Sequence, residues 1–234
     1  MTNAIPAALD RSSHAVRRLA SLASLGPDDL AVLQEAVSRT QSVAARRDLV
    51  AAGSLLSKSL LIIEGWAYRS CLLADGRRQI IQMILPGDVI HRLPEECTQP
   101  HSVIAMTDVI LASLSAPTSD LAFDGIEKAL AVSQVLHSNY LCRQITRLGR
   151  MSALERIVDW LLEVRERLEA SGQCAGDTFP LPLTQEAIAD ALGLTSVHVN
   201  RTLMALRRDD LVRVGGGRAT IVDRGRCELL VGSH

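Results

Sequence analysis

Apolar residues near the start of the chain recur at helical spacing. The recurring positions are Leu19, Leu22, Leu25, Leu30, Leu33 and Val37. A Gly26-Pro27 pair interrupts them. Because glycine followed by proline breaks a helix, the pattern predicts two short helices between residues 16 and 37.

From about residue 40 to residue 115 the pattern changes to short β-rich runs. They are separated by the turn signals Ala52-Gly53, Glu64-Gly65, Ala74-Asp75-Gly76 and Pro86-Gly87-Asp88. Residues 77–85 alternate loosely between polar and apolar, and residues 103–106 and 109–111 are predicted to be returning strands. Evenly spaced short strands favour a small barrel or jelly roll over a parallel sheet.

A long helical pattern follows from about residue 119 to residue 170, with no proline and almost no glycine. Its recurring apolar positions include Ile126, Leu130, Leu136, Leu141, Ile145, Leu148, Ile157, Leu161 and Leu162. The pattern predicts one very long helix, or two that are broken near residues 149–152. A helix of this length cannot bury its apolar stripe within a small barrel, so we expect it to pair with a second copy of the chain.

Two capped helices are predicted beyond a small, polar loop at residues 171–177. Thr184 can cap a first helix that ends at Gly193, and Thr195 can cap a second. Their expected buried positions are Ile188, Ala191 and Leu192 in the first helix, and Val199, Leu203 and Leu206 in the second. Two short helices around a glycine turn form a helix-turn-helix, and the glycines at 215–217 between two strand-like runs predict a hairpin wing.

The second of these helices would direct polar and basic side chains outward. The expected outward positions are Ser196, Val197, Asn200, Arg201 and Met204. Asparagine can pair with adenine and arginine with guanine in the major groove, where a recognition helix meets base edges with its N-terminal part. Arg218 in the wing could reach a phosphate. The alternative is a helical pair packed on a hairpin, with Asn200 and Arg201 solvated.

Composition narrows the class of protein without deciding it. A chain of 234 residues suits two compact units joined by a linker. Its net charge of -1 gives no basic excess, so a surface that binds DNA must be local. Lys58 and Lys128 are the only lysines. The remaining basic residues are therefore arginines, which suit bidentate recognition of phosphate or guanine.

Other classes of function find little support in the sequence. The five cysteines lack metal-ligand spacing and are expected to be reduced thiols. The chain has neither a leader-like start nor an apolar run of membrane length, so a cytoplasmic protein without membrane contact is expected. No P-loop, HExxH, nucleophile-elbow or paired-carboxylate motif occurs, so neither a catalytic site nor a metal site is predicted.

Five segments form a specific combination by their order and spacing: residues 64–67, 73–80, 85–88, 154–157 and 184–211. Through these segments the chain resembles the Crp/Fnr superfamily of bacterial transcription regulators over nearly its whole length. The resemblance implies an α+β fold: an N-terminal cyclic-nucleotide-binding-type β-barrel (jelly roll) at 1–118, a long dimerisation helix at 119–150, and a C-terminal winged helix-turn-helix at 151–234. It also implies a homodimer that binds a palindromic site in double-stranded DNA, with RNA polymerase as a further partner.

The resemblance implies roles for individual residues. Arg201 matches the arginine that contacts a guanine in each half-site, and Asn200 matches the variable residue before it. Val197 stands where many members have a base-reading glutamate; valine can contact a thymine methyl but cannot accept a hydrogen bond from cytosine. The positions matched or predicted to contact the DNA backbone are Thr184, Gln185, Thr195, His198 and Arg218.

The resemblance also bears on an effector. Members that bind cyclic AMP carry a Gly-Glu pair after the Pro-Gly-Asp turn and an Arg-Ser pair further on. This chain lacks that glutamate and has His101 in place of the arginine. Because charge-assisted phosphate contacts are stronger than neutral ones, we expect that cyclic AMP does not bind. The residues of the corresponding pocket would be His91, Arg92, His101, Leu141 and Cys142.

No cofactor is predicted. Members that sense oxygen through an iron-sulfur cluster carry cysteines near the N-terminus, and residues 1–30 contain none. Haem bound through His91, Cys97 or His101 is an alternative, and Cys142 and Cys174 are candidate redox-sensitive thiols. The rival function is a cyclic-nucleotide-type sensor or protein-interaction module without DNA binding. It predicts no salt-dependent association with duplex DNA.

Overall fold

The computed structural model describes residues 13–114 and 124–232. By its internal contacts the chain divides into two compact units, residues 1–67 with 84–137 and residues 68–83 with 138–234. The domain boundaries predicted from the sequence, after residues 118 and 150, divide the chain by the order of its elements and not by contacts. They stay a prediction.

Two short helices open the first unit, as predicted. They are α1 (Ser13–Ala20) and α2 (Pro27–Ser38), separated at Gly26. Asp29 in the first turn of α2 is buried, and it accepts hydrogen bonds from the backbone N–H of Gly26 at 2.8 Å and of Ile126 at 3.1 Å. One carboxylate thereby satisfies orphan N–H groups at the starts of two helices.

Eight short strands fill residues 41–114, which confirms the predicted β-rich region. They are β1 (Gln41–Val43), β2 (Asp48–Val50), β3 (Ser59–Glu64), β4 (Ala67–Leu72), β5 (Arg78–Ile84), β6 (Val89–Ile90), β7 (Val103–Ala105) and β8 (Val109–Leu114). They form two four-stranded sheets, ordered β1-β8-β3-β6 and β2-β7-β4-β5. The pairs β1–β8, β2–β7, β3–β6 and β3–β8 are antiparallel, as in a jelly roll.

The predicted turns lie between these strands. Gly65 adopts a φ of +84°, and a Cβ there would collide with the carbonyl oxygen of Asp108. The turn between β3 and β4 therefore needs glycine. Strand β3 is buried on both faces: Leu61 packs in one cluster with Leu19 and Leu33 of the opening helices, and Ile62 packs in a second cluster with Val103.

The long helical pattern folds as two helices, α3 (Asp124–Arg150) and α4 (Ala153–Ala170). The predicted start near residue 119 lies outside the described residues. The break has a local cause: Ser152 accepts a hydrogen bond from the Glu155 N–H at 3.4 Å, and the Glu155 carboxylate accepts one from the Ser152 N–H at 2.7 Å. The hydrogen bonds with Ser152 lower the pKa of the Glu155 carboxyl. The predicted break near residues 149–152 is confirmed.

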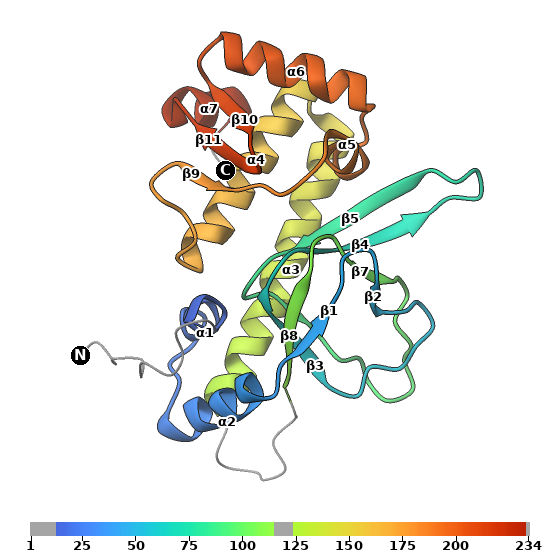
Figure 1. The fold of residues 1–234 in the computed structure, drawn as a ribbon, viewed down its shortest axis with the longest axis vertical. Coiled ribbons are helices and arrows are strands. Elements are labelled where there is room, and N and C mark those ends of the chain that lie inside the picture. The colour runs from blue at the N-terminus through green and yellow to red at the C-terminus, as the bar shows by residue number, and fades with distance from the viewer. Residues whose placement is uncertain (1–12, 115–123, 233–234) are drawn as a thin grey trace. The chain divides into compact units, whose positions relative to one another are not determined.

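The C-terminal part of the second unit combines helices with a small sheet (Figure 1). Its elements are β9 (Thr178–Pro180), α5 (Gln185–Leu192), α6 (Ser196–Arg208), β10 (Val212–Gly215), β11 (Arg218–Ile221) and α7 (Arg224–Val231). The antiparallel sheet has the order β10-β11-β9. The sequence did not predict β9 or α7. Among the described residues, no helix has the length and apolarity needed to cross a bilayer.

Candidate nucleic-acid interface

Helices α5 and α6 are fixed by the caps that the sequence predicts. The Thr184 hydroxyl accepts a hydrogen bond from the Ala187 N–H at 3.1 Å, and the Thr195 hydroxyl accepts one from the His198 N–H at 3.2 Å. Between the helices, Gly193 is left-handed with a φ of 62°. The caps therefore fix where α5 begins and ends and where α6 begins, and the left-handed glycine fixes the conformation of the turn between them.

The buried side of α6 differs in one position from the prediction. Val199 and Leu206 are buried, but Leu203 is only half-buried, and Thr202 is buried instead. The Thr202 hydroxyl donates to the carbonyl oxygen of His198 at 2.9 Å. This bond to the preceding turn satisfies the hydroxyl, so that threonine can pack as a small apolar residue.

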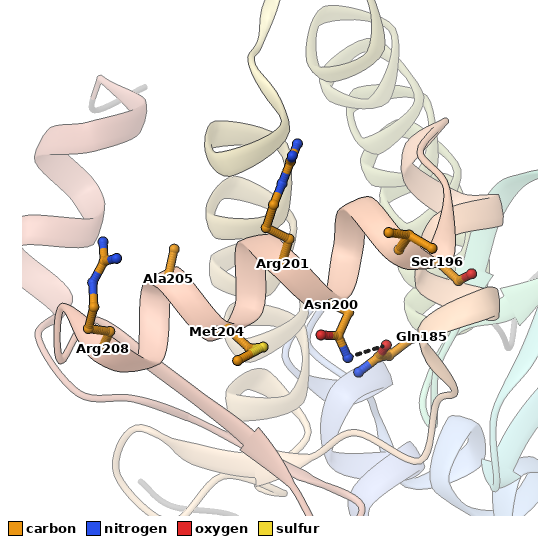
Figure 2. A pocket seen from close by; sticks show the side chains of 8 residues that line it. Gln185, Ser196, Asn200, Arg201, Met204, Ala205 and Arg208 are labelled. Carbon is orange, nitrogen blue, oxygen red and sulfur yellow. Dashed lines mark hydrogen bonds between the residues drawn. The ribbon is translucent and has the colours of Figure 1, made fainter.

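The outward side of α6 exposes all of the predicted base-reading residues, Ser196, Val197, Asn200 and Arg201. They line a hollow of about 740 Å³ together with Gln185, Met204, Ala205 and Arg208. Figure 2 shows the side chains of Arg201, Ala205 and Arg208 projecting from the same side of the helix. Sequence reasoning placed Met204 on this side but missed Ala205 and Arg208, which follow Arg201 at helical spacing.

A hydrogen bond joins the two helices across this hollow. The Asn200 side-chain amide donates to the Gln185 side-chain oxygen at 3.0 Å (Figure 2). Gln185 is the first residue of α5 and is predicted to contact the DNA backbone, whereas Asn200 is predicted to read a base. The hydrogen bond therefore fixes the position of the Asn200 side chain relative to α5. The contact spans 15 positions of the chain, and no sequence pattern pointed to it.

The charges of this region explain how a nearly neutral chain can present a basic surface. Several arginines are neutralised locally by carboxylates, and these pairs include Arg208–Asp209, Arg213–Asp210 and Arg224–Glu228. Within the described part of the chain, neither Arg201 nor Arg218 has a carboxylate within ion-pair distance. Their guanidinium groups are exposed and remain free to bind an external anion.

The wing lies beside the capped end of α5. A second hollow, of about 470 Å³, is lined by Thr184 and Gln185, by Arg207, and by the glycines at 215–217 of the turn between β10 and β11. Gly216 and Gly217 have φ of 61° and 72°, which supports the tight hairpin turn that the sequence predicts. Thr195 is exposed at the start of α6, and His198 is half-buried one turn later.

The β4–β5 hairpin contacts α5 from the side away from its cap. The Arg78 guanidinium donates to one oxygen of Asp190 at 2.8 and 2.6 Å, and to the Tyr68 hydroxyl at 3.0 Å. Partial burial acts to lower the pKa of Arg78, but the Asp190 bond and charge outweigh it and raise that pKa. The C-terminal end of α5 is thus held by residues more than a hundred positions away in the chain.

A buried charge cluster joins α3 to α4. Helices α5 and α6 both pack against α4. Arg147 has only 1% of its side chain exposed and donates to Asp159 at 2.8 Å through Nε and to Glu163 at 2.8 Å through Nη2. Arg167 donates to Glu163 at 3.3 Å and to the Met83 carbonyl oxygen at 2.8 Å. The platform under the helix-turn-helix is therefore held by buried, paired charges.

The residues predicted for an effector pocket lie in both units. In the first unit, His91 and His101 are half-buried and Arg92 is exposed, and the His91 ring meets the edge of the His137 ring with centroids 5.4 Å apart. On α3 in the second unit, Leu141 is half-buried and Cys142 is exposed. The described residues contain no group of three or more potential metal ligands.

Cys174, a candidate redox-sensitive thiol, is half-buried in the loop before β9. Burial raises the pKa of its thiol. Because the thiolate is the reactive form, this shift weighs against Cys174 as a redox sensor.

A glycine turn between capped helices, an exposed second helix and an adjacent hairpin define a winged helix-turn-helix DNA-binding protein. Residues 155–228 match the family model described as a Crp-like helix-turn-helix domain. The chain is 30% identical over 216 residues to the transcriptional activator protein FnrL of Cereibacter sphaeroides, covering 88% of this chain and 85% of FnrL. It belongs to the Crp/Fnr superfamily and is a DNA-binding transcription regulator of that type.

Two further comparisons agree. The chain is 32% identical over 176 residues to the nitrogen fixation regulation protein FixK of Bradyrhizobium diazoefficiens, covering 72% of each protein. The structure of FixK2 from Bradyrhizobium japonicum has a TM-score of 0.72 and 24% sequence identity, covering 84% of this chain and 98% of that one. The structural match supports the α+β fold with a C-terminal winged helix-turn-helix.

Proposed function

We propose that this regulator binds a palindromic operator as a homodimer, with Arg201 and Asn200 at base edges of the major groove. The observation that carries the proposal is the Arg201 guanidinium, which is exposed on the outward side of α6 and has no carboxylate partner in the described ranges. Backbone contacts fall to Thr184, Gln185, Thr195, His198 and Arg218, which are positioned by the caps and the wing.

An exposed stripe on α3 supports the homodimer. It contains only uncharged residues, and its members are Ala131, Val132, Val135, Ser138, Asn139, Cys142, Ile145, Thr146 and Gly149. Val135 is 61% exposed and Ile145 is 71% exposed. Successive members of the stripe are mostly three or four residues apart, which is the spacing of the seam between two packed helices. The α3 helix of a second copy would cover this stripe. A two-fold dimer would place its recognition helices about 34–36 Å apart, one turn of DNA.

Two arginine substitutions should have different effects on DNA binding. Arg201→Ala should weaken binding to the preferred operator by about 1–3 kcal/mol and relax preference at one base pair in each half-site. Arg218→Ala should weaken binding to all duplexes alike and reduce the salt slope by about one. Selection from a random duplex pool, followed by titrations at several salt concentrations, measures both. An unchanged operator preference in Arg201→Ala would remove this residue from base reading.

We further propose that the protein binds neither cyclic AMP nor a cofactor. The chain offers His101 where relatives that bind cyclic AMP have arginine. Titration calorimetry with cyclic AMP should show no binding in the micromolar range, since the phosphate lacks its charge-assisted contacts. Micromolar affinity would overturn this proposal, and a Soret band after incubation with haem would overturn its cofactor part.

A further inference from the structure

Two apolar side chains are unusually exposed on the outward side of α6. Val197 is 77% exposed and Met204 is 67% exposed, whereas the buried residues of α6 are Val199, Thr202 and Leu206. Val197 and Met204 are seven positions apart, which is about 20° short of two full helical turns. They therefore lie almost in line along the helix, with Asn200 on one side of that line and Arg201 on the other.

The hollow around this line has a distinctive chemistry. Arg201 and Arg208 supply donors, and Ser196, Asn200 and Gln185 supply neutral polar groups. None of the residues that line the hollow carries a carboxylate. A cytosine amino group, which needs an acceptor, thus finds no charged partner here. Asn200 and Gln185 already use part of their hydrogen-bonding capacity on each other.

The major groove offers one apolar group at its base edges, the C5-methyl of thymine. We propose that Val197 and Met204 together read two thymine methyls in each half-site, at different base pairs. This inference rests on the proposed function, because it assumes that α6 enters the major groove. It adds Met204 as a specificity-determining residue and assigns a common ligand chemistry, a 5-methylpyrimidine, to two positions of α6.

The spacing of the two side chains requires two separate base pairs. Seven residues of α-helix span about 10.5 Å along the axis. The rise of duplex DNA is about 3.4 Å per base pair, so this distance corresponds to about three steps. The unbranched methionine side chain can adapt to a methyl that is not directly below its backbone, whereas valine is stiff and sits close to the helix.

Deoxyuridine substitution tests the inference, because it removes only the methyl group of thymine. The full-length protein is first used to select an operator, and each thymine of one half-site is then replaced singly by deoxyuridine. We expect two positions at which affinity falls about three- to fivefold, the loss of one buried methyl contact. Val197→Ala should remove the penalty at one of these positions, and Met204→Ala should remove it at the other.

The controls separate this inference from the proposed function. Leu229→Ala removes a comparably exposed apolar side chain on α7, 79% exposed and outside the hollow, and should keep both penalties. If no duplex is selected, the proposed function itself fails. If an operator is selected but every deoxyuridine-substituted form binds as tightly as the original, methyl reading is wrong while DNA binding stands. A penalty that persists unchanged in Met204→Ala would exclude Met204 as a reader.

Discussion

Replacing Ile145 by glutamate is expected to separate the proposed dimer and to weaken operator binding at least about 100-fold. Ile145 belongs to the uncharged stripe of α3 and is 71% exposed in the single chain. In a two-fold seam the new carboxylate occurs twice, in symmetric positions. Both charges would lose water on association and repel each other, and about 2.7 kcal/mol of lost binding energy gives the stated factor. Light scattering after gel filtration and operator titration measure the two effects.

The matched control for this variant is Leu72→Glu. Leu72 on β4 is also 71% exposed but does not belong to the stripe, so its replacement should change neither the molar mass nor the affinity. Because Ile145 is exposed, Ile145→Glu should keep the helix content and unfolding temperature of the isolated chain. A variant that remains dimeric at the same concentrations as the original protein would place the interface elsewhere.

Replacing Arg147 by methionine is expected to lower the free energy of unfolding of the second unit by about 3–5 kcal/mol. The substitution keeps much of the side-chain length but leaves the Asp159 and Glu163 carboxylates without this cation, although their side chains are only 2% and 5% exposed. Arg143 still pairs with Asp159 and Arg167 still pairs with Glu163, so each buried carboxylate keeps one guanidinium but loses another. Removing one partner from a buried ion-pair cluster costs several kcal/mol, far more than the pair contributes net. The loss should also raise the mobility of α4 under the recognition helix.

Urea unfolding followed by the fluorescence of Trp160 measures this loss. Trp160 lies on α4 and is 3% exposed, and a Trp66→Phe background removes the other tryptophan. The matched control is Arg77→Met, whose ion pair with Asp75 also lies in the second unit but joins side chains that are 77% and 53% exposed. Such surface pairs contribute about 0–1 kcal/mol. A loss below about 1 kcal/mol in Arg147→Met would contradict this expectation and show that Arg143 and Arg167 suffice to pair the two carboxylates.

Local signals account for the parts of the interface that were predictable from the sequence. Thr184, Gly193 and Thr195 act on backbone groups only a few residues away, so their positions in the sequence predict both helices and the turn between them. The outward position of Arg201 follows from the same helical period that buries Val199. The two unpredicted elements lack such signals: β9 has three residues, and α7 buries only Cys227.

Electrostatics could not be predicted in the same way. The net charge of -1 does not predict that Arg201 and Arg218 are unpaired, because a net charge does not show which charged side chains form ion pairs. Only the tertiary structure shows that Arg208 pairs with Asp209 and that Arg213 pairs with Asp210. The burial of Thr202 in place of Leu203 likewise depends on a bond to the preceding turn, which a hydrophobic pattern does not record.

By itself the sequence determined the order of the elements other than β9 and α7, the caps and turn of the helix-turn-helix, the outward direction of its recognition helix, and the resemblance to a regulator family. The tertiary structure decided which side chains meet: Gln185 with Asn200, Arg78 with Asp190, and Arg147 with Asp159 and Glu163. The physical reason is range. Helical period, capping and turn geometry act within a few residues of the backbone, whereas a salt bridge or a buried amide depends on where the whole chain places its partner.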